Sequence, residues 1–111
     1  MGYDEALAER IRALVAGEQG LAEKKMFGGL AFMVGGNMAI AASGQGGLLV
    51  RVDPAESDKL VATTSAEVMV MRGRAMDGWL RVASADVATK RELATWVRRG
   101  VGFARSLPAK R

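Results

Sequence analysis

Cysteine and histidine are both absent from this chain of 111 residues. Without cysteine there is no disulfide, no thiol chemistry and no thiolate ligand for a metal. Without histidine there is no imidazole to act as an acid or base near neutral pH or to bind zinc. The sequence therefore predicts no metal site of the usual kind, and the lack of cysteine fits a reducing cytoplasm.

Residues that carry other kinds of chemistry are also scarce. Aromatic residues make up 5% of the chain, which is too few to stack the bases of a single-stranded nucleic acid. The glycine pairs each precede a predicted strand, and none belongs to a phosphate-binding pattern. Every acidic residue has a ready role in helix capping or solvation, and no serine has a histidine to activate it. We expect no catalytic residue and no cofactor, and hence no enzymatic activity.

The composition is that of an ordinary globular protein, because half of the residues are apolar and a quarter are charged. The length predicts a single domain over residues 1–111. The net charge of +4 permits contact with a polyanion but also describes many proteins that bind none. Residues 30–50 carry no charge, yet five glycines interrupt them and disfavour a membrane-spanning helix. We expect no association with a membrane.

The uncharged stretch has the pattern of a β-hairpin. Leu30–Val34 and Asn37–Ala41 are two short apolar blocks, and Gly35 and Gly36 separate them. Two residues that readily take positive φ suit the tight turn of a hairpin. We therefore predict that this hairpin lies at the centre of a sheet and that helices pack on one face of the sheet.

Apolar periodicity and capping residues predict the remaining elements. The predicted helices are one from Asp4 to Gly17, a short one begun by Asp53, Pro54 and Glu56, and a final one capped by Ser84 or Asp86 and ended by Pro108. The predicted strands are Ala22–Phe27, Leu48–Val52, Glu67–Met71 and, after a turn at Asp77 and Gly78, Trp79–Val82. The predicted order is α-β-β-β-β-α-β-β-α. It indicates an α+β fold of two layers, an antiparallel sheet with helices largely on one face. Gly100, on the apolar side of the last helix, predicts a close approach to a strand.

Six methionines allow two interpretations. Their flexible side chains could fill the core from alternating strand positions, or they could form a pliable apolar binding surface. We favour the core for the methionines and also for Phe27, Phe32 and Trp79. The methionines in question are Met26, Met33, Met38, Met69, Met71 and Met76.

Basic residues recur along the final helix. Arg91, Arg98 and Arg105 are spaced by seven residues and therefore form a ridge opposite its apolar side, with Arg99 beside it. Such a ridge is a candidate contact for the phosphates of a nucleic acid. A solvated helix surface is the simpler interpretation, and it is the one that we favour.

Several segments together resemble the N-terminal domain of the TfoX/Sxy family of competence regulators. They are Lys25-Met26-Phe27-Gly28-Gly29-Leu30, Phe32-Met33-Val34, Gly36-Asn37-Met38, Leu49-Val50-Arg51-Val52, Gly73-Arg74-Ala75-Met76-Asp77-Gly78-Trp79 and Phe103-Ala104-Arg105-Ser106-Leu107-Pro108. The resemblance implies a compact bacterial domain with an antiparallel sheet, often associated with transcriptional regulation. It supplies no catalytic residues. Full-length regulators of this family carry a second, C-terminal domain, so we expect a stand-alone copy of the first.

The residues and the resemblance together predict a cytoplasmic, non-enzymatic domain that regulates transcription by contacting another protein. A sheet edge could also support a homodimer. One alternative is direct nucleic-acid binding through Arg91, Arg98, Arg99 and Arg105. Another is a small-molecule-binding domain or enzyme with a pocket between the sheet and the helices.

Overall fold

The computed structural model describes residues 3–26 and 28–108. Phe27, which we expected to end the first strand and to enter the core, lies outside the described residues. The elements in chain order are α1 (Glu5–Val15), β1 (Leu21–Met26), β2 (Gly29–Val34), β3 (Asn37–Ala42), β4 (Leu48–Arg51), the 3-10 turn η1 (Pro54–Glu56), α2 (Ser57–Thr63), β5 (Glu67–Met71), β6 (Arg74–Val82), the 3-10 turn η2 (Ser84–Val87) and α3 (Lys90–Ser106).

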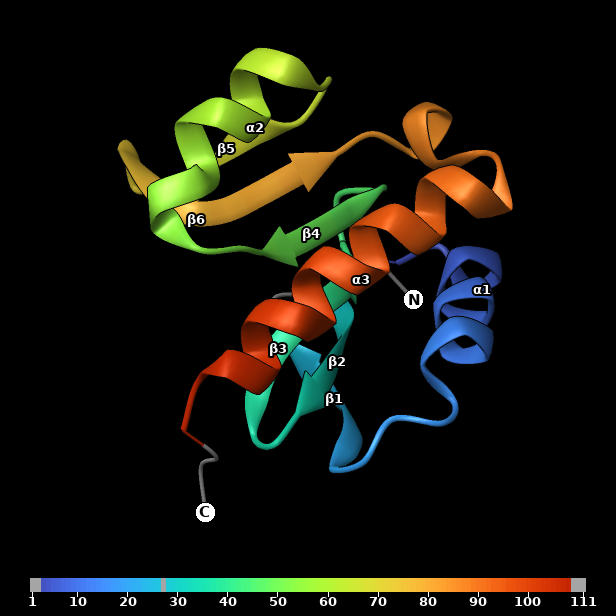
Figure 1. The fold of residues 1–111 in the computed structure, drawn as a ribbon. Coiled ribbons are helices and arrows are strands. Elements are labelled where there is room, and N and C mark those ends of the chain that lie inside the picture. Colours follow the sequence, from blue (N-terminus) through green and yellow to red (C-terminus); the bar gives the residue numbers. More distant parts are fainter. Residues whose placement is uncertain (1–2, 27, 109–111) are drawn as a thin grey trace.

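The strands form one six-stranded sheet in the order β1-β2-β3-β4-β6-β5, and every neighbouring pair is antiparallel. The helices lie on one side of this sheet, with α3 crossing β3 and β4 and α1 beside it (Figure 1). The predicted α+β class, the order of the elements and the placement of the helices are thus confirmed.

The main core fills the space between the sheet and the helices. Leu7, Ile11 and Val15 recur along one side of α1 and are all buried, and Asp4 caps the helix by accepting a hydrogen bond from the backbone N–H of Leu7 at 3.1 Å. From the sheet, the core takes Leu30, Phe32, Val34, Ile40, Leu48, Val50, Leu80 and Val82, and from α3 it takes Leu93, Trp96, Val97, Val101 and Ala104. The prediction that Phe32 belongs to the core is confirmed.

The β2–β3 hairpin forms as predicted. Gly35 and Gly36 join the two strands with φ angles of +61° and +81°. One irregularity follows from its register, in which Phe32 pairs with Ile40 while the next residue, Met33, pairs with Met38. Ala39 is therefore an extra residue in β3, a β-bulge that changes which side of the sheet the following side chains face.

The last strand begins five residues earlier than predicted. We expected it to start at Trp79, after a turn at Asp77 and Gly78, but β6 begins at Arg74. The φ angles of Arg72 (+54°) and Gly73 (+75°) already complete a tight turn, so no second turn is needed. Asp77 and Gly78 instead lie within β6, where the pairing with β5 shifts between Val68 and Met69.

Two predicted helix starts are also wrong in detail. Asp53 caps only the 3-10 turn η1, by accepting from the N–H of Ala55 at 2.9 Å, and α2 begins at Ser57. Residues 84–87 likewise form a 3-10 turn, so neither Ser84 nor Asp86 caps the last helix. Thr89 does so, in a reciprocal capping box with Glu92. Short 3-10 turns precede both helices. The cap of α3 is thereby displaced to Thr89, whereas α2 has no side-chain cap of its own.

Candidate interaction surface

The two sides of the sheet carry two separate hydrophobic clusters. We call the side that packs against the helices the helix face and the other side the open face. The main core lies on the helix face. The second cluster consists of Ala31, Met38, Ala41 and Leu49, with Met26, Met33, Met69 and Trp79 packed against them. Within residues 3–26 and 28–108, every member of this second cluster comes from a strand.

A row of cross-strand partners shows how the open face is laid out. Lys24 pairs with Ala31, and Ala31 pairs with Ala41. The row continues through Leu49 to Arg81. Arg81 in turn pairs with Glu67 of β5. Directly opposed residues project on the same side of a sheet. These six side chains, which we call the central row, therefore cross the open face from one edge strand to the other.

The methionines belong to the open face, and our preference for the core is confirmed for Met38, which is buried in the second cluster, but is wrong for the other five. Among the described residues, the main core contains no methionine, whereas the second cluster contains Met26, Met33, Met38 and Met69. Met76 pairs directly with Met69 and so shares its side of the sheet, and Met71 follows Met69 by two positions. Of the six, only Met38 is buried, and the others are half-buried.

Trp79 also departs from the prediction, because it is half-buried on the open face rather than in the main core. Its indole ring contacts Arg51, whose guanidinium carbon lies 5.1 Å from the ring centroid. The same guanidinium carbon lies 5.5 Å from the ring of Phe103 on α3. Arg51 thus spans two aromatic rings at the border of the open face, and cation–π attraction holds its charge there.

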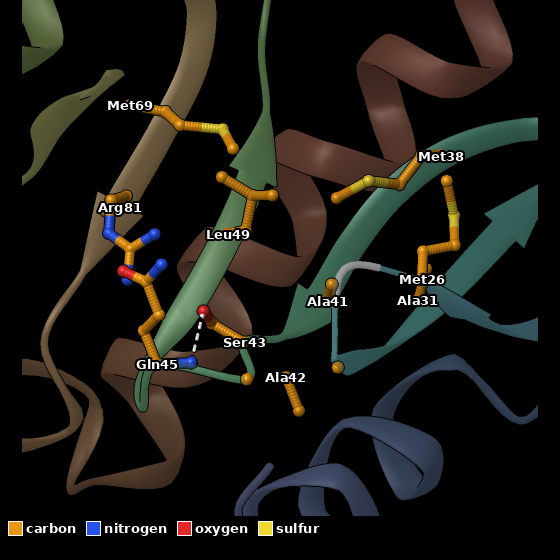
Figure 2. A pocket seen from close by; sticks show the side chains of 12 residues that line it. Met26, Ala31, Met38, Ala41, Ala42, Ser43, Gln45, Leu49, Met69 and Arg81 are labelled. Carbon is orange, nitrogen blue, oxygen red and sulfur yellow. Dashed lines mark hydrogen bonds between the residues drawn. The ribbon is translucent and has the colours of Figure 1, made fainter. Parts of the chain in front are cut away.

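A cavity of about 40 Å³ lies over the central row. Met26 and Met38 lie on one side of it and Met69 and Arg81 on the other, with Leu49 between the two pairs (Figure 2). Gln45 points toward Arg81, and the backbone N–H of Gln45 donates to Ser43 Oγ at 3.1 Å (Figure 2). The cavity is smaller than the usual volume of a drug-sized site. It is space that the surrounding methionine side chains leave unfilled.

The open face carries an excess of positive charge. Cross-strand pairing places Lys24, Arg51, Arg74 and Arg81 on it, against one carboxylate, Glu67. Four cations and one anion leave a net charge of +3 for these side chains. An apolar centre with a charged border is the arrangement found in protein–protein interfaces.

The predicted nucleic-acid contacts lie on the opposite side of the molecule from this cluster, on α3. Arg91, Arg98 and Arg105 are exposed, as the spacing predicted. Arg105 is not available as a free cation, because its Nε donates to Glu18 Oε1 at 2.9 Å. Arg99 stacks over Trp96, with 4.5 Å from its guanidinium carbon to the ring centroid. The structure thus leaves Arg91 and Arg98 as the two members of the ridge without a carboxylate partner among the described residues.

The two edges of the sheet differ in character. β1 carries Glu23, Lys24 and Lys25, and charges on an edge strand oppose pairing with another chain. β5 has only Glu67 at its start, and its Val70 is 63% exposed. β5 is therefore the edge with less protection against pairing.

Three of the carboxylates, those of Glu9, Glu18 and Glu23, form ion pairs with arginines. Glu23 of β1 accepts hydrogen bonds from Arg12 of α1, at 2.6 Å from Nε and 2.8 Å from Nη2. These bonds lower the pKa of the Glu23 carboxyl below its ordinary value and raise the pKa of Arg12.

No group of three or more potential metal ligands occurs in the described part of the chain. In the same part, no helix has the length and apolar character needed to cross a membrane.

The model of one known family matches this chain: the TfoX N-terminal domain matches residues 13–104. The matched range includes the whole sheet and most of α3. Searches of curated proteins and of solved structures return no significant match.

Proposed function

The chain belongs to the TfoX N-terminal domain family, and from this we propose that it is a non-enzymatic domain that regulates transcription in the bacterial cytoplasm by contacting another protein. The open face of the sheet is the proposed contact surface. This extends the family resemblance to particular residues, because it assigns the contact to Met33, Met69, Trp79 and their neighbours.

One observation carries the proposal: the second hydrophobic cluster has no covering layer among the described residues. Along a strand with one side in water, apolar and polar residues normally alternate, so that the solvent-facing side of the sheet carries polar side chains. Here that side carries several methionines and a tryptophan. Exposed apolar patches with a polar border mark interaction sites. Methionine suits such a site because its unbranched side chain adapts to different surfaces.

A pull-down from the native lysate, with and without nuclease, tests this function. The test variant is Met33→Glu with Met69→Glu, which places two charges at the second cluster. The control is Val70→Glu, on the same strand as Met69 but 63% exposed and on the other side of β5. We expect the wild type and the control to retain a protein partner after nuclease treatment and the double variant to lose it.

Circular dichroism of each variant shows whether the fold is retained. Equal capture by the folded double variant would contradict the proposed surface. Capture of no partner by the wild type would contradict the proposed function itself.

Direct nucleic-acid binding through α3 is the second candidate, and the exposed Arg91 and Arg98 favour it. The test is Arg91→Glu with Arg98→Glu, because reversal of Arg105 would also break its contact with Glu18. A control with the same change of charge is Lys59→Glu with Arg72→Glu, both exposed and outside α3. If this candidate is right, affinity for DNA or RNA falls steeply with salt and is lost only in the α3 variant.

Small-molecule binding is the third candidate, favoured by a cleft of about 310 Å³. Val52, Leu60 and Phe103 supply apolar walls to this cleft between η1, α2 and α3. Asp53 and Glu56 on one side and Arg98 and Arg99 on the other supply charges of both signs. A thermal-shift screen tests it, since a ligand that binds only the folded protein raises the melting temperature.

A further inference from the structure

We propose that the open face binds an amphipathic helix with an acidic outer border, supplied by a different protein. This inference rests on the proposed function, because it names the kind of partner that the same surface would bind.

The dimensions of the central row fit a helix of moderate length. The row crosses six strands and therefore five intervals between strands, from Lys24 on β1 to Glu67 on β5. At about 4.8 Å for each interval the row is about 24 Å long, which equals about 16 residues of α-helix. A helix of four to five turns placed along the row would contact both ends and the apolar centre at once.

The side chains at the centre suit the apolar side of such a helix. Ala31 and Ala41 are directly paired and short, and the longer side chains of Met26, Met38 and Met69 surround them. A helix laid into an apolar groove is a recurrent mode of recognition, and methionines allow its side chains to be accommodated without a fixed jigsaw fit. The cavity of about 40 Å³ over these residues is space that an inserted side chain would fill.

Charge determines which occupant we infer. Among the residues that cross-strand pairing places on the face, four are cations, Lys24, Arg51, Arg74 and Arg81, and one is a carboxylate, Glu67. A second copy placed face to face would bring together two surfaces with the same positive net charge, and like charges across an interface are unfavourable. A nucleic acid would meet methionines at the centre, and among the described residues Trp79 is the one aromatic side chain of the second cluster on which a base could stack. An acidic helix satisfies both the apolar centre and the basic border.

Three synthetic peptides of 16 residues test the proposal by fluorescence anisotropy. The first has leucines at positions that form one side of a helix and glutamates elsewhere. The second has the same composition in an order that destroys the apolar side, and the third replaces each glutamate with lysine. We expect the first to bind at least about tenfold more tightly than either of the others.

A variant of the protein locates the binding. Lys24→Glu with Arg81→Gln removes positive charge from both halves of the central row, and glutamine at 81 avoids a second carboxylate opposite Glu67. The control, Lys25→Glu with Lys59→Gln, makes the same change of net charge elsewhere, since Lys25 pairs with the core residue Leu30 and so faces the other side. We expect about tenfold weaker binding of the acidic peptide by the first variant and unchanged binding by the control.

Several outcomes would overturn the inference. Equal affinity for the first and second peptides would show that charge attracts them without recognition of a helical apolar side. An equal loss of affinity in the control variant would place the binding site elsewhere. A concentration-dependent dimer in sedimentation, abolished by Met33→Glu with Met69→Glu, would make a second copy the occupant. Failure of all peptides while the lysate partner is still captured through Met33 and Met69 would refute the acidic helix and leave the proposed function standing.

Discussion

Gly100 of α3 lies directly against the backbone of Ala39 in β3, so that a Cβ on Gly100 would overlap the carbonyl oxygen of Ala39. The same Cβ would lie 3.0 Å from the carbonyl carbon of Ala39 and 3.3 Å from Cγ1 of Val50. Ala39 is the extra residue of the β3 bulge. A glycine in the helix therefore accommodates a backbone irregularity in the strand, and the two features position α3 on the sheet.

The first prediction concerns this contact. Gly100→Ala should lower the free energy of unfolding by about 1–3 kcal/mol, because overpacking against backbone outweighs the gain in helix propensity. The matched control is Gly102→Ala in the same helix, whose added Cβ would meet nothing within 4 Å. That variant should be more stable than the wild type by up to about 1 kcal/mol. Urea denaturation measures both, and equal effects would contradict the close approach.

The second prediction separates the two faces of β2. Phe32 is fully buried in the main core and its neighbour Met33 is half-buried on the open face. Phe32→Ala should cost about 3–5 kcal/mol of stability, and Met33→Ala about 1 kcal/mol, because the second side chain has less surface to lose. Chemical denaturation of the two variants is the measurement. A cost for Met33→Ala as large as that for Phe32→Ala would place Met33 in a true core.

The third prediction tests the start of α3. Thr89 accepts a hydrogen bond from the N–H of Glu92, whereas Ser84 makes no capping bond. Thr89→Ala should therefore lower stability by about 1 kcal/mol. Ser84→Ala, the matched control, should leave the free energy of unfolding within about 0.5 kcal/mol of the wild type. Thermal unfolding followed by circular dichroism distinguishes the two, and the reverse order would restore Ser84 as the cap.

The fourth prediction concerns pH and the pair formed by Arg12 and Glu23. The hydrogen bonds from Arg12 lower the pKa of Glu23 in the folded protein, so the pair stabilises the fold fully above the unfolded carboxyl pKa, about 4.3. This stabilisation is lost as the pH falls through the lower, folded pKa. Glu23→Gln should thus reduce the melting temperature slightly at pH 7, and the difference from wild type should disappear under acidic conditions.

The effect at Glu23 should be small because both side chains are partly exposed and solvent screens them. Arg12→Gln and the double variant complete a double-mutant cycle that isolates the pair. A difference in melting temperature that stays constant from pH 7 to pH 3 would argue against a paired carboxylate.

Much of the fold was predictable because local signals agreed with the tertiary structure. Paired glycines marked the β2–β3 turn, Asp4 marked the start of α1, and the apolar side of α3 marked where it packs. The errors arose where a capping or turn residue belongs to a different element from the one that it predicted. Asp53 and the residues at 84–87 begin 3-10 turns rather than helices, and a bulge absorbs Asp77 and Gly78 inside a strand.

The candidate surface was less predictable. Alternation along a strand shows that Met69 and Met71 lie on the same side of the sheet. It does not show whether that side packs against the helices. In β3, the bulge at Ala39 places Ala39 and Ile40 together in the main core and breaks the alternation that would have assigned Met38. A usable signal was the chemistry itself, because the core positions carry Leu, Ile, Val and Phe while the methionines gather on the remaining positions.

The order of the strands also has a consequence for how the chain reaches this structure. β1 to β4 follow one another in space as in sequence, so their pairings close short loops, whereas β4 pairs next with β6 across the segment that contains α2 and β5. Contacts between residues close in sequence form faster than distant ones. We expect the four-stranded meander and the β5–β6 hairpin to assemble separately, and the joining of β4 to β6 to limit the rate of folding.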